Sequence, residues 1–156
     1  MPQGIRETHP YLQLGCIEGA TKLILGSFPV YECTNIDNKE KEDKREKEGT
    51  VRFFYGSNRN SLWTIYKKHI DNSIEQPWQA PNIIDSLTTR KIAISDTIIS
   101  CERYSIRTDK VNGKIIIIEE SSEDSALRNK TWNKEQIQSL IKKWCNQNLV
   151  YFQRCT

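Results

Sequence analysis

Two apolar runs rich in aliphatic residues constrain the fold of this chain more than any other feature. They are TKLILGSFP at 21–29 and KIAISDTII at 91–99, and a third run, LVYFQRC, follows at 149–155. Short apolar runs bounded by turn residues are typical of strands in a parallel sheet, because such strands are covered on both faces. The sequence therefore predicts a sheet whose strands lie far apart in the chain.

Helical patterns occupy much of the sequence between these runs. Segments 61–70 and 133–145 place apolar residues on one helix face, and Pro81 favours the first turn of a helix at 80–90. We also expect a helix near 121–129, where serine and aspartate can cap its first turn. The expected order is strand, helix, helix, strand, hairpin, helix, helix, strand.

Residues 104–120 carry the pattern of an inserted β-hairpin. Two strand-like stretches flank Asn112 and Gly113, a dipeptide that favours tight hairpin turns. The stretch at 37–50 alternates in charge, has no apolar residue and is expected to form a loop insertion. Strands that alternate with helices predict an α/β fold: three αβα layers around a central, mostly parallel sheet.

Length and composition indicate one domain over residues 1–156. The net charge of +3 is compatible with nucleic-acid binding but does not require it. No run reaches the roughly 18 apolar residues of a membrane helix, so we expect no membrane partner. The N-terminus lacks the basic-then-apolar pattern of a secretory signal, so we expect a cytoplasmic protein.

Cysteine and histidine usage argues against several kinds of site. The five cysteines are scattered without a CxxC pair, which argues against a disulfide framework and a zinc or iron–sulfur site. The two histidines, His9 and His69, are isolated, so neither a Ser-His triad nor a histidine-rich metal site is expected. The sequence predicts no metal and no cofactor.

Polar residues gather where the expected strands end, which is where α/β sheets bind ligands. The loops after Leu25, Ile94 and Phe152 are therefore the places to search. One of them leads to FFYGSNRNSLW at 53–63, with two asparagines, an arginine and a tryptophan between an aromatic run and a helix. This amide chemistry favours a site for a small polar ligand over a solvent loop.

Four blocks occur in order over roughly residues 7–135: LILGSFP, YGSNRNSLW, IAISDTIISCER and SEDSALRN. Together they resemble the uracil-DNA glycosylase superfamily, closest to the branch of hypoxanthine (deoxyinosine)-DNA glycosylases and uracil-DNA glycosylase-like proteins. That branch carries a strand ending in G-S-[FM]-P, then H-P-x-N-x-[FW]-W, a strand with D-V-x-x-S-C-x-R, and an S-x-D-S segment.

Two departures from the family pattern bear on activity. Ser57 and Asn58 stand where the family has H-P, and no residue after Cys155 matches the family's final block, which clamps the DNA backbone. The resemblance thus implies a single glycosylase-like domain at 1–156 that lacks its C-terminal motif.

The resemblance implies a DNA glycosylase of base excision repair. It would flip a deaminated base, uracil or hypoxanthine, out of DNA and hydrolyse its N-glycosidic bond without a metal. The alternative is a non-catalytic or specialised relative that binds DNA or a modified base, for example in defence against phage DNA.

Two residues are expected to be catalytic. Asn60 matches the asparagine of the second block and could orient water or bond the base edge, while it could also cap the following helix. Asp96 ends the second strand run and could activate water, or it could brace neighbouring loops.

The remaining expected site residues form two groups. The base-binding group comprises a turn and one further aromatic residue: Gly26, Ser27, Phe28, Pro29 and Tyr55. The rings of Phe28 and Tyr55 could instead belong to the core. The DNA-binding group could instead pair with acids, fix a loop or cap a helix: Arg59, Ser100, Arg103, Ser122 and Ser125.

Overall fold

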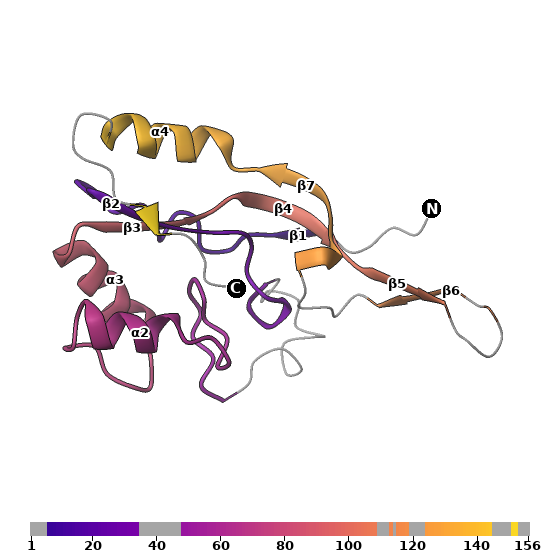
Figure 1. The fold of residues 1–156 in the computed structure, drawn as a ribbon, viewed down its shortest axis with the longest axis horizontal. Helices are drawn as coiled ribbons and strands as arrows, with labels where there is room; N and C mark the ends of the chain where they lie inside the picture. The colour runs from indigo at the N-terminus through magenta and orange to yellow at the C-terminus, as the bar shows by residue number, and fades with distance from the viewer. Residues whose placement is uncertain are drawn as a thin grey trace.

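The computed structural model describes residues 6–34, 48–108, 113, 115–118, 124–144 and 151–152, and these form a mixed α/β structure (Figure 1). Most of the charged stretch at 37–50 lies outside the described residues, as do Asn112 and Ser122.

The two main apolar runs pair as parallel strands. β2 (Lys22–Gly26) runs beside β3 (Ile92–Asp96) over five residue pairs. A short β8 (Tyr151–Phe152) pairs in parallel with the other side of β2. The strands expected from the three apolar runs therefore meet in one sheet, in the order β3-β2-β8.

A second, antiparallel sheet continues from the first. β4 (Ile98–Arg103) follows β3 after a single residue and pairs with β1 (Arg6–Thr8) on one side and β7 (Leu127–Trp132) on the other. The expected central, mostly parallel sheet is therefore found only in part, because five of the eight described strands are antiparallel to their neighbours.

The predicted helix at 121–129 is wrong. A short 3-10 turn (Asp124–Ala126) leads directly into β7, which pairs with β4 along its length. The ladder between β7 and β4 is a non-local interaction that outweighs the local helix propensity.

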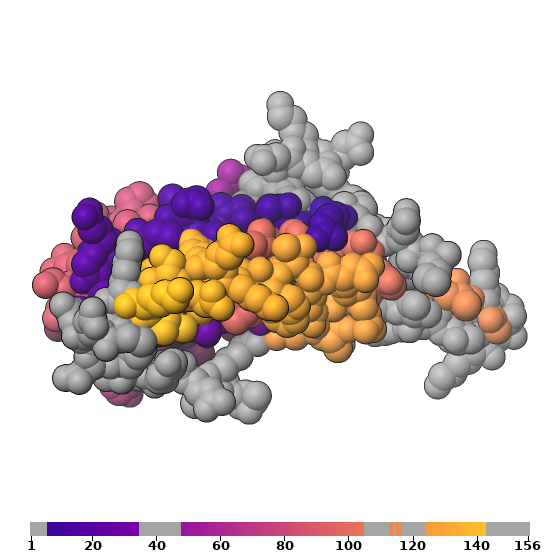
Figure 2. Space-filling view, turned by 90° about the horizontal axis from the view of Figure 1, so that it is seen from above, coloured from indigo at the N-terminus to yellow at the C-terminus, as the bar shows by residue number. Residues whose placement is uncertain are grey.

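Three predicted helices are confirmed as α2 (Leu62–His69), α3 (Ala80–Thr89) and α4 (Lys134–Trp144). In Figure 1, α4 lies on one side of β2 and β3, and α2 and α3 lie on the other. Figure 2 shows α4 and β7 together along one face of the molecule. Among the described helices, none combines the length and the apolar character that crossing a membrane requires.

The predicted hairpin is also confirmed. β5 (Ser105–Thr108) pairs antiparallel with β6 (Ile115–Ile118) and projects from the body of the molecule (Figure 1).

Aromatic residues dominate the main core, which lies between α2, α3 and β3. Phe53 packs on Phe54 and Trp63, and the Trp63 indole N–H donates to the Phe54 carbonyl oxygen at 3.0 Å. A second cluster, under the antiparallel sheet, contains Phe28, Ile98, Cys101 and Leu127. The aromatic run at 53–54 is therefore buried, and its burial fixes where the following polar loop begins.

Candidate functional site

The carboxyl ends of β2 and β3 lie side by side. Gly26 stands opposite Asp96 in the parallel register. Beyond the strands, the Thr97 N–H donates to the Gly26 carbonyl oxygen at 3.0 Å and the Ile98 N–H to that of Ser27 at 3.1 Å. The first and third sequence blocks are thus joined, as expected of parallel strands whose ends meet at one edge.

Gly26 is required because two side chains approach its backbone. A Cβ at this position would overlap both Asp96 Oδ1 and the Tyr55 hydroxyl oxygen. The Tyr55 backbone has a positive φ of 53°, a conformation that a bulky residue rarely adopts. The space beside Gly26 is therefore occupied by two side chains of the protein itself. One of them, Tyr55, belongs to the second block, so the second block contacts the first.

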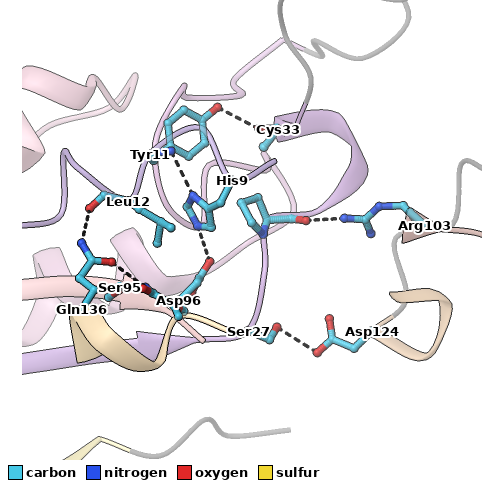
Figure 3. A network of polar contacts seen from close by, with 12 residues as sticks. His9, Tyr11, Leu12, Ser27, Cys33, Ser95, Asp96, Arg103, Asp124 and Gln136 are labelled. Atoms are coloured by element: carbon cyan, nitrogen blue, oxygen red, sulfur yellow. Dashed lines mark hydrogen bonds and ion pairs between the residues drawn. The ribbon is translucent and has the colours of Figure 1, made fainter. Parts of the chain in front are cut away.

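Asp96 is held by a hydrogen bond from His9 (Figure 3). His9 Nε2 lies 2.9 Å from Asp96 Oδ2, and the Tyr11 backbone N–H donates to His9 Nδ1 at 3.1 Å. Because Nδ1 accepts, the imidazole proton is on Nε2 and is donated to the carboxylate. The His9 side chain is completely buried, and that of Asp96 is 7% exposed. We call His9, Gly26, Tyr55 and Asp96 the strand-end cluster.

His9 was missed in the sequence analysis, where the two histidines were set aside as isolated. Its role depends on β1 and the loop after it, which place it 87 positions from Asp96 in sequence yet in direct contact. No spacing or motif in a single sequence carries that information.

Asn133, at the start of α4, ties this helix to the end of β3. Its backbone N–H donates to the Thr97 carbonyl oxygen at 2.8 Å, and its amide lies 3.0 Å from the Asp96 carbonyl oxygen. The same amide donates to Gln136 Oε1 at 2.6 Å, a bond between two side chains at the start of α4. The backbone beneath Asp96 is therefore fixed from two elements.

The fourth block also reaches the first. The Ser27 hydroxyl donates to Asp124 Oδ2 at 3.1 Å across 97 positions of sequence (Figure 3). Ser125 is exposed next to it. The expectation that Asp124 begins a helix is wrong, but its carboxylate does brace the turn after β2.

Arg103 is buried, which corrects its expected contact with DNA. Its Nε donates to Glu7 Oε2 at 3.0 Å and its Nη2 to the Pro29 carbonyl oxygen at 2.6 Å. Only 2% of its surface is exposed. The guanidinium cannot reach an external phosphate from there, and it serves instead to fix the loop that follows β2.

Phe28 and Ser100 require the same correction. The Phe28 ring is buried and packs edge-on against His9, with the ring centres 5.7 Å apart, so it is not available to stack on a base. Ser100 is buried as well, and its hydroxyl accepts from Arg6 Nη2 at 2.9 Å. Both were placed in the site because the sequence blocks do not reveal which strand face points inward.

Cys101 lies in the same buried layer. Burial raises the pKa of its thiol to about 11, so the thiol stays protonated at neutral pH. A protonated thiol is a poor nucleophile, which argues against covalent catalysis through this residue.

Arg59 pairs with an acid of the fold. Its Nη2 contacts Glu32 Oε1, while 64% of the arginine side chain remains exposed. Of the two partners left open by the sequence, phosphate or protein carboxylate, the structure gives it the carboxylate.

Asn60 lies in a surface cleft next to the start of α2. Its Oδ1 accepts from the Leu62 N–H at 2.8 Å, so the expected capping role is present. The cleft has a volume of about 480 Å³, and we call it the amide cleft; its lining residues are Gly49, Ser57, Asn58, Asn60, Gln76, Pro77 and Trp78. Neither Asp96 nor the turn at 26–29 lines it, so the two expected catalytic residues do not share one cleft.

Comparison with known proteins identifies no relative. No protein-family model matches the chain, and no curated protein or solved structure matches it significantly. Function must therefore be inferred from this chain's own residues and their geometry.

Proposed function

We propose that this protein is a cytoplasmic DNA glycosylase of base excision repair that removes a deaminated base, uracil or hypoxanthine, from DNA. Its fold would be the three-layer αβα arrangement of the uracil-DNA glycosylase superfamily, extended here by the antiparallel sheet. One observation carries the proposal: four sequence blocks that are far apart in the chain converge on the turn after β2.

The convergence consists of four contacts that the other three blocks make with the first block. Asp96 and Tyr55 approach Gly26 from the third and second blocks. Arg103 bonds the Pro29 carbonyl oxygen, and Asp124 bonds Ser27 from the fourth block. Chance matches to short motifs would not be expected to meet at one turn.

The chemistry of N-glycosidic hydrolysis fits a braced carboxylate at this place. The sugar gains positive charge and the base gains negative charge as the bond breaks, and a water must be positioned for attack. Asp96 can serve as the general base, with Oδ2 fixed by His9 and Oδ1 beside Gly26. His9 acts through Asp96 and is a positioning residue.

Asn60 is the proposed contact to the base. Because Asn60 and Asp96 do not line one cleft in the free protein, their joint action requires the complex with DNA to bring them together. The Oδ1 of Asn60 is used by the Leu62 N–H, so its Nδ2 is left to donate to a base carbonyl. Such a donor stabilises negative charge that develops on the leaving base.

One observation favours the alternative, a relative that binds DNA or a modified base without turnover. Asp96 does not line the amide cleft that Asn60 lines. In addition, Phe28 and Arg103 are buried and contact other residues of the protein, so neither is available to DNA. A binding protein would need the amide cleft but not the carboxylate.

A cleavage assay separates the two functions. Labelled oligonucleotides with one uracil or one hypoxanthine would be incubated with the protein and treated with alkali, which cuts at abasic sites. We expect cleavage by the wild type and a loss of at least ~100-fold in Asp96→Asn, since general-base catalysis contributes 10²–10⁴-fold. Asp85→Asn, an exposed aspartate on α3, is the matched control. DNA binding without any cleavage would reject the glycosylase and favour the binding protein.

A further inference from the structure

We propose that the amide cleft binds a neutral, planar heterocycle bearing carbonyl groups, such as an oxopyrimidine or oxopurine base, and that Gln76 and Trp78 take part in its recognition. Both residues lie outside the four sequence blocks. This inference rests on the proposed function in its choice of a base as ligand, and it moves base recognition away from the turn at 26–29.

The cleft has the size of a small-molecule site. Its volume of about 480 Å³ lies within the roughly 300–1,000 Å³ of typical ligand pockets. Two segments build it, one at 49–60 and one at 76–78, and three of its side chains are amides.

None of the described residues that line the cleft has a charged side chain. A phosphate site would present arginine, lysine or several backbone N–H groups, and an amine site would present carboxylates. A lining of amides, one hydroxyl and one indole instead selects a neutral polar ligand. The sugar and the base of a nucleotide are both neutral, but only the base is planar and offers carbonyl oxygens and ring N–H groups to the amides and the indole.

Several hydrogen-bonding groups of the cleft have no partner in the described part of the chain. Asn60 uses Oδ1 for the Leu62 N–H, which leaves its Nδ2 unused. Asn58 uses Nδ2 for the Glu48 carbonyl oxygen, which leaves its Oδ1 unused. Gln76 and the Trp78 indole N–H make no hydrogen bond to described residues. Donors from Asn60 and Trp78 suit carbonyl oxygens, while Asn58 and Gln76 can accept a ring N–H.

Trp78 supplies an aromatic ring on which a base can stack, whereas the turn at 26–29 supplies none because Phe28 is buried. It is half-buried and packs partly against the main core, so the indole is anchored but still reaches the cleft. Phe28, the aromatic residue expected to stack on the base, is buried in the second core cluster. Stacking on an aromatic ring strengthens base binding, so Trp78 is the residue of the cleft that can supply this contribution.

The test is a calorimetric titration of the whole chain with uracil and with hypoxanthine, and with 2-deoxyribose 5-phosphate as the charged, non-planar comparison. Gln76→Ala removes one amide. Asn60→Asp keeps the oxygen that accepts from Leu62 but removes the Nδ2 donor. Trp78→Phe keeps an aromatic ring and removes the N–H. Gln79→Ala, an exposed glutamine outside the cleft, is the matched control.

We expect at least one base to bind and the sugar phosphate not to bind. Gln76→Ala, Asn60→Asp and Trp78→Phe should each weaken binding about 3–10-fold, the range for loss of one neutral hydrogen bond. Gln79→Ala should stay within twofold. Urea unfolding of each variant confirms that the comparison is made between folded proteins.

Three results would overturn the inference: no binding of either base by the wild type, equal loss in Gln76→Ala and Gln79→Ala, or tighter binding of the sugar phosphate than of the bases. The outcomes are separable from those of the cleavage assay. Base binding without cleavage rejects the glycosylase and keeps the cleft, whereas cleavage that Gln76→Ala and Asn60→Asp leave unchanged keeps the glycosylase and rejects the cleft.

Discussion

His9 and Asp96 form a buried pair whose two members depend on each other. The imidazole is completely buried, accepts the Tyr11 N–H and donates to Asp96, so it has one orientation and one tautomer. A carboxylate that is nine-tenths buried needs such a donor, because an unpaired buried charge is costly. The same contact that stabilises Asp96 also aims its other oxygen toward Gly26.

Replacing His9 therefore tests both stability and the site. His9→Ala should lower the free energy of unfolding by about 2–4 kcal/mol, through the lost donor to Asp96 and the cavity left beside Phe28 and Phe54. Urea denaturation measures the change. His69→Ala removes the other, exposed histidine and should change the free energy by less than about 0.5 kcal/mol. Equal effects of the two substitutions would contradict the buried pair.

Arg103 is a second residue whose burial decides its role. Arg103→Met should lower the free energy of unfolding by about 3–5 kcal/mol, because Glu7 would be left buried without its partner. Arg128→Met, which replaces an exposed arginine on β7, should cost no more than about 0.5 kcal/mol. Thermal or urea unfolding measures both, and a similar cost for the two arginines would show that Arg103 is not structural.

At the scale of elements, a buried polar network joins α2 to α3. The Ser86 hydroxyl donates to Asp71 Oδ2 at 2.6 Å, the Ser73 hydroxyl donates to Oδ1 at 2.6 Å, and the Tyr66 hydroxyl lies 3.0 Å from Ser86 Oγ. The hydrogen bonds from Ser73, then those from Ser86, hold the pKa of Asp71 well below its usual 3.8. The two helices are thus fixed to each other under β3 by an ionised carboxylate.

The lowered pKa of Asp71 predicts a pH dependence. Because the folded state favours the ionised form, the network's full contribution is present above pH 3.8, the unfolded value, and is lost as the pH falls toward the lower folded pKa. Asp71→Asn should cost about 1–3 kcal/mol at pH 7, and its difference from the wild type should shrink below pH 3.8. Urea unfolding between pH 7 and pH 2.5 measures this. Asp85→Asn on α3 should show no such convergence.

At the scale of the whole molecule, two sheets share one continuous stretch of chain. β3 ends at Asp96, Thr97 intervenes, and β4 begins at Ile98, so the parallel sheet passes into the antiparallel sheet at the carboxylate. The strand-end cluster lies at this junction, where β1, β2, the loop before α2 and the start of α4 all converge. A site at a junction of sheets depends on the complete fold rather than on one supersecondary unit.

The pairing of β8 with β2 makes a prediction at this scale. A chain ending after Trp144 would lose the partner of Leu23 and Ile24 and expose the edge of β2. We expect lower thermal stability and more aggregation by light scattering, because an exposed apolar edge strand pairs with other chains. A chain ending after Phe152 keeps β8 and is the control. Similar behaviour of the two truncations would contradict a stabilising role for this pairing.

Local patterns predicted the elements well where the interactions that form them are local. The helices at 61–70, 80–90 and 133–145, and the hairpin within 104–120, agree with α2, α3, α4 and the β5–β6 pair. The helix expected at 121–129 failed because β7 exists only through its ladder to β4, which no local propensity reports.

The sequence by itself determined the apolar runs that became β2 and β3, the helix periods, and the positions of Gly26 and Asp96 at strand ends. Those features depend on residue spacing along the chain, whereas the pairing of Gly26 with Asp96 comes from the parallel register of the folded sheet. Only the tertiary structure decided which of the predicted site residues face inward: Phe28, Ser100 and Arg103 are buried, and His9 reaches Asp96 from β1. Burial and long-range contact depend on how sheets and helices pack, and that information is not contained in the spacing of residues along the chain.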